Sequence, residues 1–347
     1  MMPSLLHQLD KLPTTGMITY AGEHISVAEL IKRAGEIRQQ YPQFHQLTIA
    51  VYYTNLAEFI TALIAFDGWC SAIYLCPPDV SIPKKELIKW PLEDGVADSG
   101  LVKNQHDVAS LDVTQTSWYM ATSGTTGEPK WFSHSLLSLI TSTKYSQQLQ
   151  FLCWALLYQP FRFAGLQVVL QALLSGADLV DVADYEPLDQ MTLLKQGEVT
   201  AVSATPSLWR QLLMTGQLSE LTLNHITLGG EIADQSVLDK LKRVFPTAKL
   251  RHIYASTEAG VGFIVSDGRA GFPAKWLEDQ TLAVALKVSD KQHLLVKPSH
   301  QVCQTLALKI DAQGYVDTLD TVQMVDDRVL FLGRATGTIN VGGNKVH

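Results

Sequence analysis

The chain has 347 residues, of which 46% are hydrophobic and 18% are charged. This length predicts about two domains and a core that needs neither a disulfide framework nor a structural metal. The net charge of −7, from 27 basic and 34 acidic side chains, argues against a nucleic-acid-binding protein with a broadly basic surface.

The cysteine spacing and the apolar runs indicate in which cellular compartment the chain is expected. Cys70, Cys76, Cys153 and Cys303 form no CxxC pair, so the spacing predicts neither a zinc cluster nor a disulfide framework. The first residues lack a basic start followed by a long apolar run, and no apolar run is long enough to span a bilayer. We therefore predict a cytoplasmic chain with reduced thiols and no membrane segment.

Strand-like and helix-like segments alternate along most of the chain. Ser26 is the expected N-cap of a helix at 26–41, followed by a strand at 47–53, a helix at 55–69 and a strand at 72–75. After a polar, irregular stretch at 80–116, we expect a strand at 117–120 and a helix at 133–149. Further strands are expected at 177–182, 201–204 and 226–228, and helices at 188–197, 207–215 and 234–244. This alternation predicts an α/β fold with mainly parallel sheets and helices on both faces.

The pattern changes from Gly271 onward. Short strands are expected at 283–288, 294–297, 305–310 and 329–332, without long helices between them. This texture predicts a small antiparallel, barrel-like β subdomain.

The most informative stretch is the loop at residues 122–130, with the sequence TSGTTGEPK. Its glycines, Gly124 and Gly127, let the backbone approach an anion closely, and the intervening amides can form an anion-binding nest. Its hydroxyls and its cation supply hydrogen bonds and charge; they are Thr122, Ser123, Thr125, Thr126 and Lys130. Pro129 precedes the lysine, so this is not a Walker A loop.

The loop and three later motifs resemble the adenylate-forming enzymes, which include acyl- and aryl-CoA synthetases, luciferases and peptide-synthetase adenylation domains. The later motifs are GGE at 229–231, YASTE at 254–258, and the run GY, TLD, GR and VGGNKV between 314 and 346. The resemblance implies the large N-terminal domain of that superfamily, with two layered α/β subdomains and a small β subdomain. We expect the large domain at 1–335, with the α/β layers at about 1–270, the β subdomain at 271–333 and a hinge at 336–347.

The resemblance implies that a carboxylate attacks the α-phosphate of ATP, which gives an acyl adenylate and pyrophosphate. The loop would hold the phosphates, with Lys130 as a catalytic cation. Thr257 would bond the α-phosphate, and Glu258 would bind Mg²⁺, for which a carboxylate is a suitable hard ligand. The adenosine would lie on residues of the later motifs, which are Gly230, Glu231, Tyr254, Ala255, Ser256, Asp320 and Arg334. Of these, Tyr254 would lie against the adenine, and Asp320 would accept hydrogen bonds from the ribose hydroxyls.

The resemblance places the acid pocket around Phe161, Arg162 and Phe163. Gly229 and Gly260 would complete its walls, and Val261 and Phe263 either belong to those walls or to the core. Amino-acid-activating members carry an aspartate beside the phenylalanine, and no register supplies one here, so a neutral aryl or aliphatic acid is favoured. Arg162 either pairs with an anionic group of the substrate or is held within the protein.

Several positions depart from the family pattern. Thr336 and Asn340 replace the usual hinge acid and lysine, Leu319 replaces the glycine of TGD, and Ala255 replaces the glycine of YGxTE. Lys345 belongs to the hinge and is not the catalytic lysine of the C-terminal lid domain. We expect the lid domain to be absent from this chain and adenylate formation to be slow without it.

Three functions are compatible with these residues. The first is an acid–thiol ligase that passes the acyl group to coenzyme A or to a phosphopantetheinyl acyl carrier protein, as a monomer or homodimer. The second is a catalytically idle nucleotide- or acyl-binding module, or half of a split enzyme. The third is an amino-acid adenylation domain, which the missing aspartate disfavours.

Overall fold

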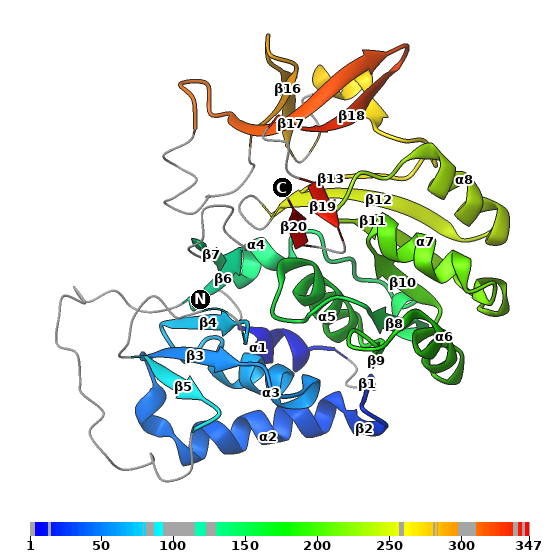
Figure 1. The fold of residues 1–347 in the computed structure, drawn as a ribbon. Helices are drawn as coiled ribbons and strands as arrows, with labels where there is room; N and C mark the ends of the chain where they lie inside the picture. Colours follow the sequence, from blue (N-terminus) through cyan, green and yellow to red (C-terminus); the bar gives the residue numbers. More distant parts are fainter. Residues whose placement is uncertain are drawn as a thin grey trace.

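The computed structural model describes residues 4–12, 15–78, 80, 87–92, 115–122, 130–256, 260–279, 282, 284–297, 310–335, 339–341 and 344–346, the last two ranges as backbone only. Two mainly parallel sheets and one antiparallel sheet follow one another from one end of the molecule to the other (Figure 1). The predicted fold class, layered α/β subdomains with a small β subdomain, is confirmed.

A five-stranded sheet lies at one end of the molecule. Its order is β5-β3-β4-β6-β7, and β7 alone among these strands runs antiparallel to its neighbour. The strands are β3 (Thr48–Tyr52), β4 (Ala72–Cys76), β5 (Ile88–Trp90), β6 (Ser117–Thr122) and β7 (Lys130–Ser135). Helices α2 (Val27–Gln40) and α3 (Leu56–Phe66) cover one face, and Ser26 caps α2 as predicted by accepting the Glu29 amide at 3.1 Å.

An eight-stranded sheet forms the middle of the molecule. Its order is β13-β12-β11-β10-β8-β9-β1-β2, with parallel pairing from β12 to β1 and an antiparallel strand at each edge. The strands are β1 (Met17–Tyr20), β2 (Glu23–Ser26), β8 (Cys153–Leu156), β9 (Asp178–Asp181), β10 (Ala201–Ala204), β11 (His225–Gly229), β12 (Lys249–Ser256) and β13 (Gly260–Val265).

Helices cover both faces of this middle sheet. One buried core joins the two parallel sheets through α1 (Leu5–Leu9), α2, α3, α4 (Leu136–Ile140) and α5 (Phe163–Ser175). A second core lies on the outer face, under α6 (Pro187–Gln196), α7 (Pro206–Met214) and α8 (Gln235–Val244). None of the helices in the described part of the chain combines the length and apolarity needed to cross a bilayer.

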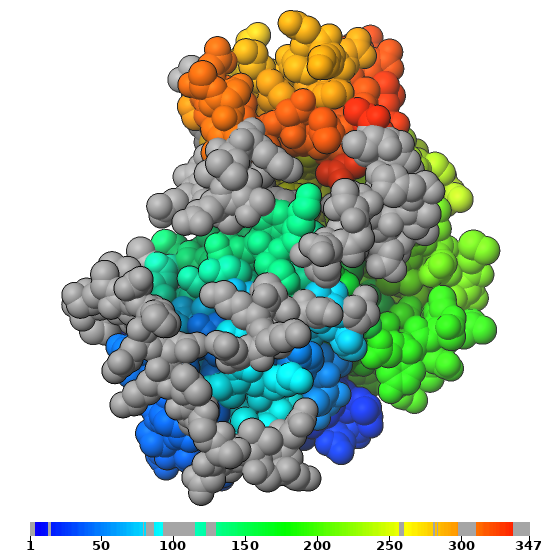
Figure 2. Space-filling view, turned by 60° about the vertical axis from the view of Figure 1, so that its left-hand side comes forward, coloured from blue at the N-terminus to red at the C-terminus, as the bar shows by residue number. Residues whose placement is uncertain are grey.

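The third sheet is antiparallel and stands at the other end of the molecule (Figure 2). Its order is β14-β18-β17-β16-β15, with a core of its own. The strands are β14 (Phe272–Pro273), β15 (Ala285–Val288), β16 (His293–Lys297), β17 (Val316–Val325) and β18 (Arg328–Arg334). Within the segment expected as a hinge, β19 (Ile339–Val341) and β20 (Asn344–Val346) form a two-stranded ladder.

One expected element is wrong, and one helix has no counterpart among the expected elements. The helix expected at 133–149 is wrong, because residues 130–135 pair with β6 as strand β7 and the following helix α4 ends at Ile140. Helix α5 was not expected, because its continuous apolar sequence lacks the periodicity of a half-exposed helix, and both of its sides are buried. Most of the strand expected at 305–310 lies outside the described residues.

Candidate functional site

The glycine-rich loop connects two paired strands. Thr122, the last residue of β6, and Lys130, the first residue of β7, are register partners, and Lys130 is exposed. Ser123, Gly124, Thr125, Thr126 and Gly127 lie outside the described residues. The structure therefore defines where this loop begins and ends, at the end of β6 where the strand leaves the five-stranded sheet.

The second motif begins at the carboxyl end of β12. Ser256 ends β12 and Gly260 begins β13, and these two residues are register partners. Thr257 and Glu258 lie outside the described residues. The carboxyl ends of strands in an open α/β sheet are the usual place for ligands.

Tyr254, Asp320 and Arg334 form a hydrogen-bonded chain between the middle and third sheets. The Tyr254 hydroxyl donates to Asp320 Oδ2 at 2.5 Å, and Arg334 Nε donates to Asp320 Oδ1 at 2.9 Å. Burial, followed by the negative charge of Asp320, raises the pKa of Tyr254 well above its ordinary value. The phenol therefore stays protonated and acts as a donor.

The ring of Tyr254 packs between two phenylalanines. It stacks with Phe263 at 5.0 Å between ring centroids and with Phe331 at 5.3 Å. A register shift between Tyr254 and Ala255 sends Val261 toward the core of the two parallel sheets and Phe263 into the core of the third sheet. Val261 and Phe263, expected on one wall, thus lie in different cores.

The GGE motif turns the chain at the end of β11. Gly229 ends the strand, and Gly230 has a φ of +79°, a conformation that glycine adopts freely. Glu231 Oε2 accepts the Ser207 amide at 2.9 Å and the Ser207 hydroxyl at 2.6 Å. The carboxylate thus stabilises the first turn of α7, where negative charge also meets the helix dipole favourably.

The expected acid-pocket residues stand at the start of α5. Phe161 and Phe163 are buried, and Arg162 is the N-cap residue between them. Arg162 Nη1 donates to the carbonyl of Ala121 at 3.2 Å, and its guanidinium carbon lies 6.0 Å from the ring centre of Phe161. This guanidinium therefore lies beside the strand end from which the glycine-rich loop starts.

A magnesium ion at this site would have few protein ligands. Within the described ranges, no three His, Cys, Asp or Glu side chains gather as metal ligands. Protein-bound Mg²⁺ commonly takes one or two carboxylates together with substrate phosphates. The expected ligand, Glu258, lies outside the described residues.

Three contact residues of this site were not predicted. Ser207 holds Glu231, Phe331 stacks on Tyr254, and the Thr318 hydroxyl accepts the Asp320 amide at 3.2 Å. The first two lie more than twenty residues from their partners, so no local pattern links them. Thr318 stands two residues before Asp320 in the TLD motif, and that spacing was the available signal.

Comparison with known families shows to which protein family the chain belongs. Residues 70–302, more than half of the chain, match the family described as AMP-binding enzyme. The chain belongs to this family. It is therefore a member of the adenylate-forming superfamily, as its motifs predicted.

Relatives of the adenylate-forming chain fall into two groups. It is 30% identical to surfactin synthase subunit 1 of Bacillus subtilis over 167 residues, which is 44% of this chain and 5% of that protein. It is 22% identical to a 2-succinylbenzoate–CoA ligase of Staphylococcus epidermidis over 360 residues, which is 93% of this chain and 75% of that protein.

A solved structure agrees with the overall fold. The o-succinylbenzoate CoA synthetase of Bacillus subtilis, in complex with its acyl-adenylate intermediate, superposes with a TM-score of 0.69 at 19% identity. The match covers 99% of this adenylate-forming chain and 81% of the other. The same synthetase has been solved with ATP and a magnesium ion.

Proposed function

We propose that this adenylate-forming chain activates a carboxylic acid with ATP, giving an acyl-AMP and pyrophosphate, for transfer to the thiol of coenzyme A. The observation that carries the proposal is the match of residues 70–302 to the AMP-binding enzymes. The ligase relatives and the ATP and acyl-adenylate complexes of the related synthetase support the same reaction.

The nucleotide would lie along the carboxyl ends of the middle sheet. Gly229 and Ser256 end neighbouring strands there, Gly230 follows the first of them, and Asp320 reaches the same region through Tyr254. A carboxylate that accepts two hydrogen bonds suits the two hydroxyls of a ribose. Asp320 is the proposed ribose acceptor, with Arg334 as its partner.

The phosphates would lie between the two strand connections. Loop residues 123–127 and Lys130 would hold the β- and γ-phosphates, and Thr257 would donate to the α-phosphate. When bound, Mg²⁺ would neutralise phosphate charge, with Glu258 as its protein ligand. The chain's own contribution is to position the reacting oxygen and phosphorus and to offset charge.

The acid would enter between the start of α5 and the start of β13. Phe161 and Phe163 are apolar and buried, and Val261 packs against the same core. These surroundings favour an aryl or aliphatic acid. Because Arg162 lies beside Ala121, we propose that its guanidinium pairs with the reacting carboxylate rather than with the far end of the acid.

The finer assignments belong to the same proposal. A carrier-protein thiol is the second candidate acceptor, since surfactin synthase subunit 1 is among the relatives. We also propose domain bounds at 1–335 and 336–347, a monomer or homodimer, and a cytoplasmic location. Three buried cysteines without disulfides, Cys70, Cys76 and Cys153, support a reducing compartment.

ATP–pyrophosphate exchange tests this function directly. We expect exchange above background with at least one member of a panel of aryl and aliphatic acids, and its loss in Glu258→Gln. ATP binding without exchange for any acid, also after addition of a lid domain from a related ligase, would instead support the idle module. Exchange with amino acids alone would identify an amino-acid adenylation domain.

A further inference from the structure

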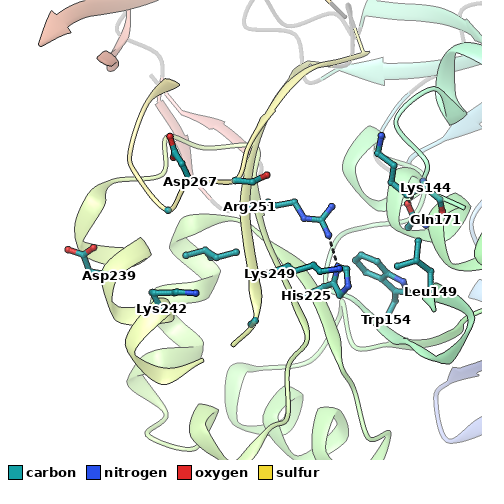
Figure 3. Close-up of a pocket in the computed structure, with 14 residues that line it drawn as sticks. Lys144, Leu149, Trp154, Gln171, His225, Asp239, Lys242, Lys249, Arg251 and Asp267 are labelled. Atoms are coloured by element: carbon teal, nitrogen blue, oxygen red, sulfur yellow. Dashed lines mark hydrogen bonds between the residues drawn. The ribbon is translucent and has the colours of Figure 1, made fainter. Parts of the chain in front are cut away.

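A cavity of 630 Å³ opens at the amino ends of the middle-sheet strands (Figure 3). Lys249 is the first residue of β12 and His225 the first residue of β11, and both line the cavity. The opposite wall comes from Lys144 and Leu149, which precede β8, and from Gln171 of α5. Strands, helix and connecting segments thus enclose a space away from the proposed nucleotide site.

The lining is rich in positive charge. Lys144, Lys242, Lys249 and Arg251 line the cavity together with two carboxylates. One of these carboxylates, Asp267, forms an ion pair with Arg328 and is largely neutralised by it. The charge balance of the walls therefore favours an anion.

Among these cations, Arg251 gives the strongest indication of an anionic ligand. It is half-buried, and its Nη2 lies 2.5 Å from Nδ1 of His225. Burial, followed by the charges of Arg251 and Lys249, lowers the pKa of His225 to about 4, so near neutral pH the ring is uncharged and accepts from the guanidinium. Among the described residues, no carboxylate forms an ion pair with Arg251.

A half-buried guanidinium without a counter-charge is costly to maintain. His225 fixes the direction of Arg251 but supplies no negative charge. A ligand that brings such a charge would therefore gain both the interaction and a donor that is already oriented.

The walls also offer apolar surface beside the cations. The indole of Trp154 lies next to the His225 ring, with 6.3 Å between ring centroids, and Leu149 lies beside it (Figure 3). A cavity of 630 Å³ is much larger than a single inorganic ion needs and lies within the size range of small-molecule pockets. The space fits an anionic group attached to an apolar body.

The cavity is separate from the strand ends that carry the motifs. Lys249 begins β12 and Ser256 ends it, and seven steps along a strand separate them by roughly 23 Å. In the same way, His225 of the cavity begins β11 and Gly229 of the GGE motif ends it.

We propose that this cavity binds a small organic anion, with its carboxylate or phosphate group on Arg251 and Lys249 and its apolar body against Trp154. The site is additional to the one proposed for ATP and the acid, and it does not depend on that proposed function.

Fluorine NMR of the protein labelled with 5-fluorotryptophan tests the proposal, because each of the seven tryptophans gives its own signal. Trp154→Phe assigns the signal from the cavity, and Trp131→Phe assigns a signal beside the glycine-rich loop. The probes are phenyl phosphate and phenylacetate, with benzyl alcohol as the uncharged control and inorganic phosphate as the control without an apolar body.

We expect phenyl phosphate or phenylacetate to shift the Trp154 signal saturably, and the two probes decide between phosphate and carboxylate. Benzyl alcohol should give no saturable shift, and inorganic phosphate should bind more weakly. Arg251→Gln should weaken binding by about tenfold or more, because a hydrogen bond to a charged group is lost. Arg251→Lys should recover part of the affinity.

The matched control is Arg243→Gln, at an exposed arginine of α8 that does not line the cavity. This variant should bind as the original chain does. A probe that shifts only the Trp131 signal, equal binding of benzyl alcohol, or unchanged affinity in a folded Arg251→Gln protein would overturn the proposal.

Discussion

The phenol of Tyr254 donates to the carboxylate of Asp320 over 2.5 Å, and this hydrogen bond joins the middle sheet to the third sheet. Arg334 donates to the other oxygen of the same carboxylate. Both oxygens proposed to receive the ribose are thus engaged within the protein. Nucleotide binding then requires Asp320 to share or exchange at least one of these donors.

Replacement of this phenol separates stability from nucleotide affinity. Tyr254→Phe keeps the ring stacked on Phe263 and Phe331 but removes the hydroxyl, so unfolding in urea should show a loss of about 1–2 kcal/mol. ATP affinity, measured by calorimetry, should stay unchanged or rise, because Asp320 Oδ2 is released. Asp320→Ala should weaken ATP binding by about tenfold or more. Equal losses of ATP affinity in both variants would contradict this assignment of roles.

Leu319 carries backbone strain that a glycine would remove. Its φ is +60°, and its side chain is 41% exposed, so little packing offsets the unfavourable conformation. We expect Leu319→Gly to be about 0.5–1 kcal/mol more stable than Leu319→Ala, which keeps the strain and also loses the side chain. Urea unfolding of the two variants measures the difference, and a less stable glycine variant would show that the turn is not strained.

Arg328 anchors the third sheet to the segment that follows β13. Its side chain is 5% exposed, pairs with Asp267 and donates to the carbonyls of Ala270 and Gly271 at 2.8 and 2.9 Å. Removing the guanidinium leaves these carbonyl oxygens without a donor, whereas Asp267, whose side chain is 39% exposed, is solvated by water, so Arg328→Met should cost about 1–3 kcal/mol in urea unfolding.

Arg269 provides the matched control for that substitution. It pairs with Asp327 at 2.8 Å, but both side chains are exposed. Arg269→Met should therefore destabilise the fold much less than Arg328→Met does in the same urea unfolding experiment. Similar losses in the two variants would show that burial does not set the strength of the Arg328 contacts.

Asp181 should give stability a measurable pH dependence. Burial raises its pKa to about 6, and the nearby charge of Asp184 acts in the same direction, while hydrogen bonds from the Ala183 amide and Tyr53 oppose the shift. The folded-state pKa of Asp181 lies above the ordinary value of 3.8. The stability that Asp181 contributes to the folded chain is therefore fully present below about pH 4 and is lost as the pH rises through 6.

Asp181→Asn removes this titration. We expect the stability of the original chain relative to Asp181→Asn to fall between pH 4 and pH 7 and then to level off. Urea unfolding across that range measures it, with the exposed Asp239→Asn as the control variant. Parallel stability curves for the original chain and Asp181→Asn would contradict the shift.

Arg162 should act on the acid substrate. Arg162→Ala should raise the KM for the acid by about tenfold or more in pyrophosphate exchange, while the KM for ATP changes less, because a charge-assisted contact to the carboxylate is lost. Arg162→Lys should recover part of the loss, and Arg243→Ala should behave as the original chain. An unchanged KM for the acid would leave Arg162 as a support for the Ala121 carbonyl only.

The sequence predicted the elements that local chemistry defines. Ser26 caps α2, and Thr205 caps α7 by accepting the Leu208 amide at 3.2 Å, so the helices expected after both positions are present. The antiparallel third sheet is confirmed as well, since its strands pair with neighbours close in sequence.

Contacts between residues far apart in the sequence could not be predicted from local patterns. A helix was expected to start at Ser133, but pairing with β6 makes residues 130–135 a strand. The separation of Val261 from Phe263 depends on a register shift against β12, which no spacing reveals. The Tyr254–Asp320 hydrogen bond spans 66 residues, and motif order alone placed those two residues in one site without showing that they bond to each other.

The pairing of β1 with β9 bears on the order in which the chain folds during synthesis. Ile18 pairs with Leu179, so the hairpin of β1 and β2 has no neighbouring strand until residues beyond 180 leave the ribosome. The five-stranded sheet, complete at Ser135, needs no such delay. A two-stranded hairpin alone is marginal in water. The first strand in sequence therefore waits for β9 before its second edge is paired, and until then that edge is open to wrong partners.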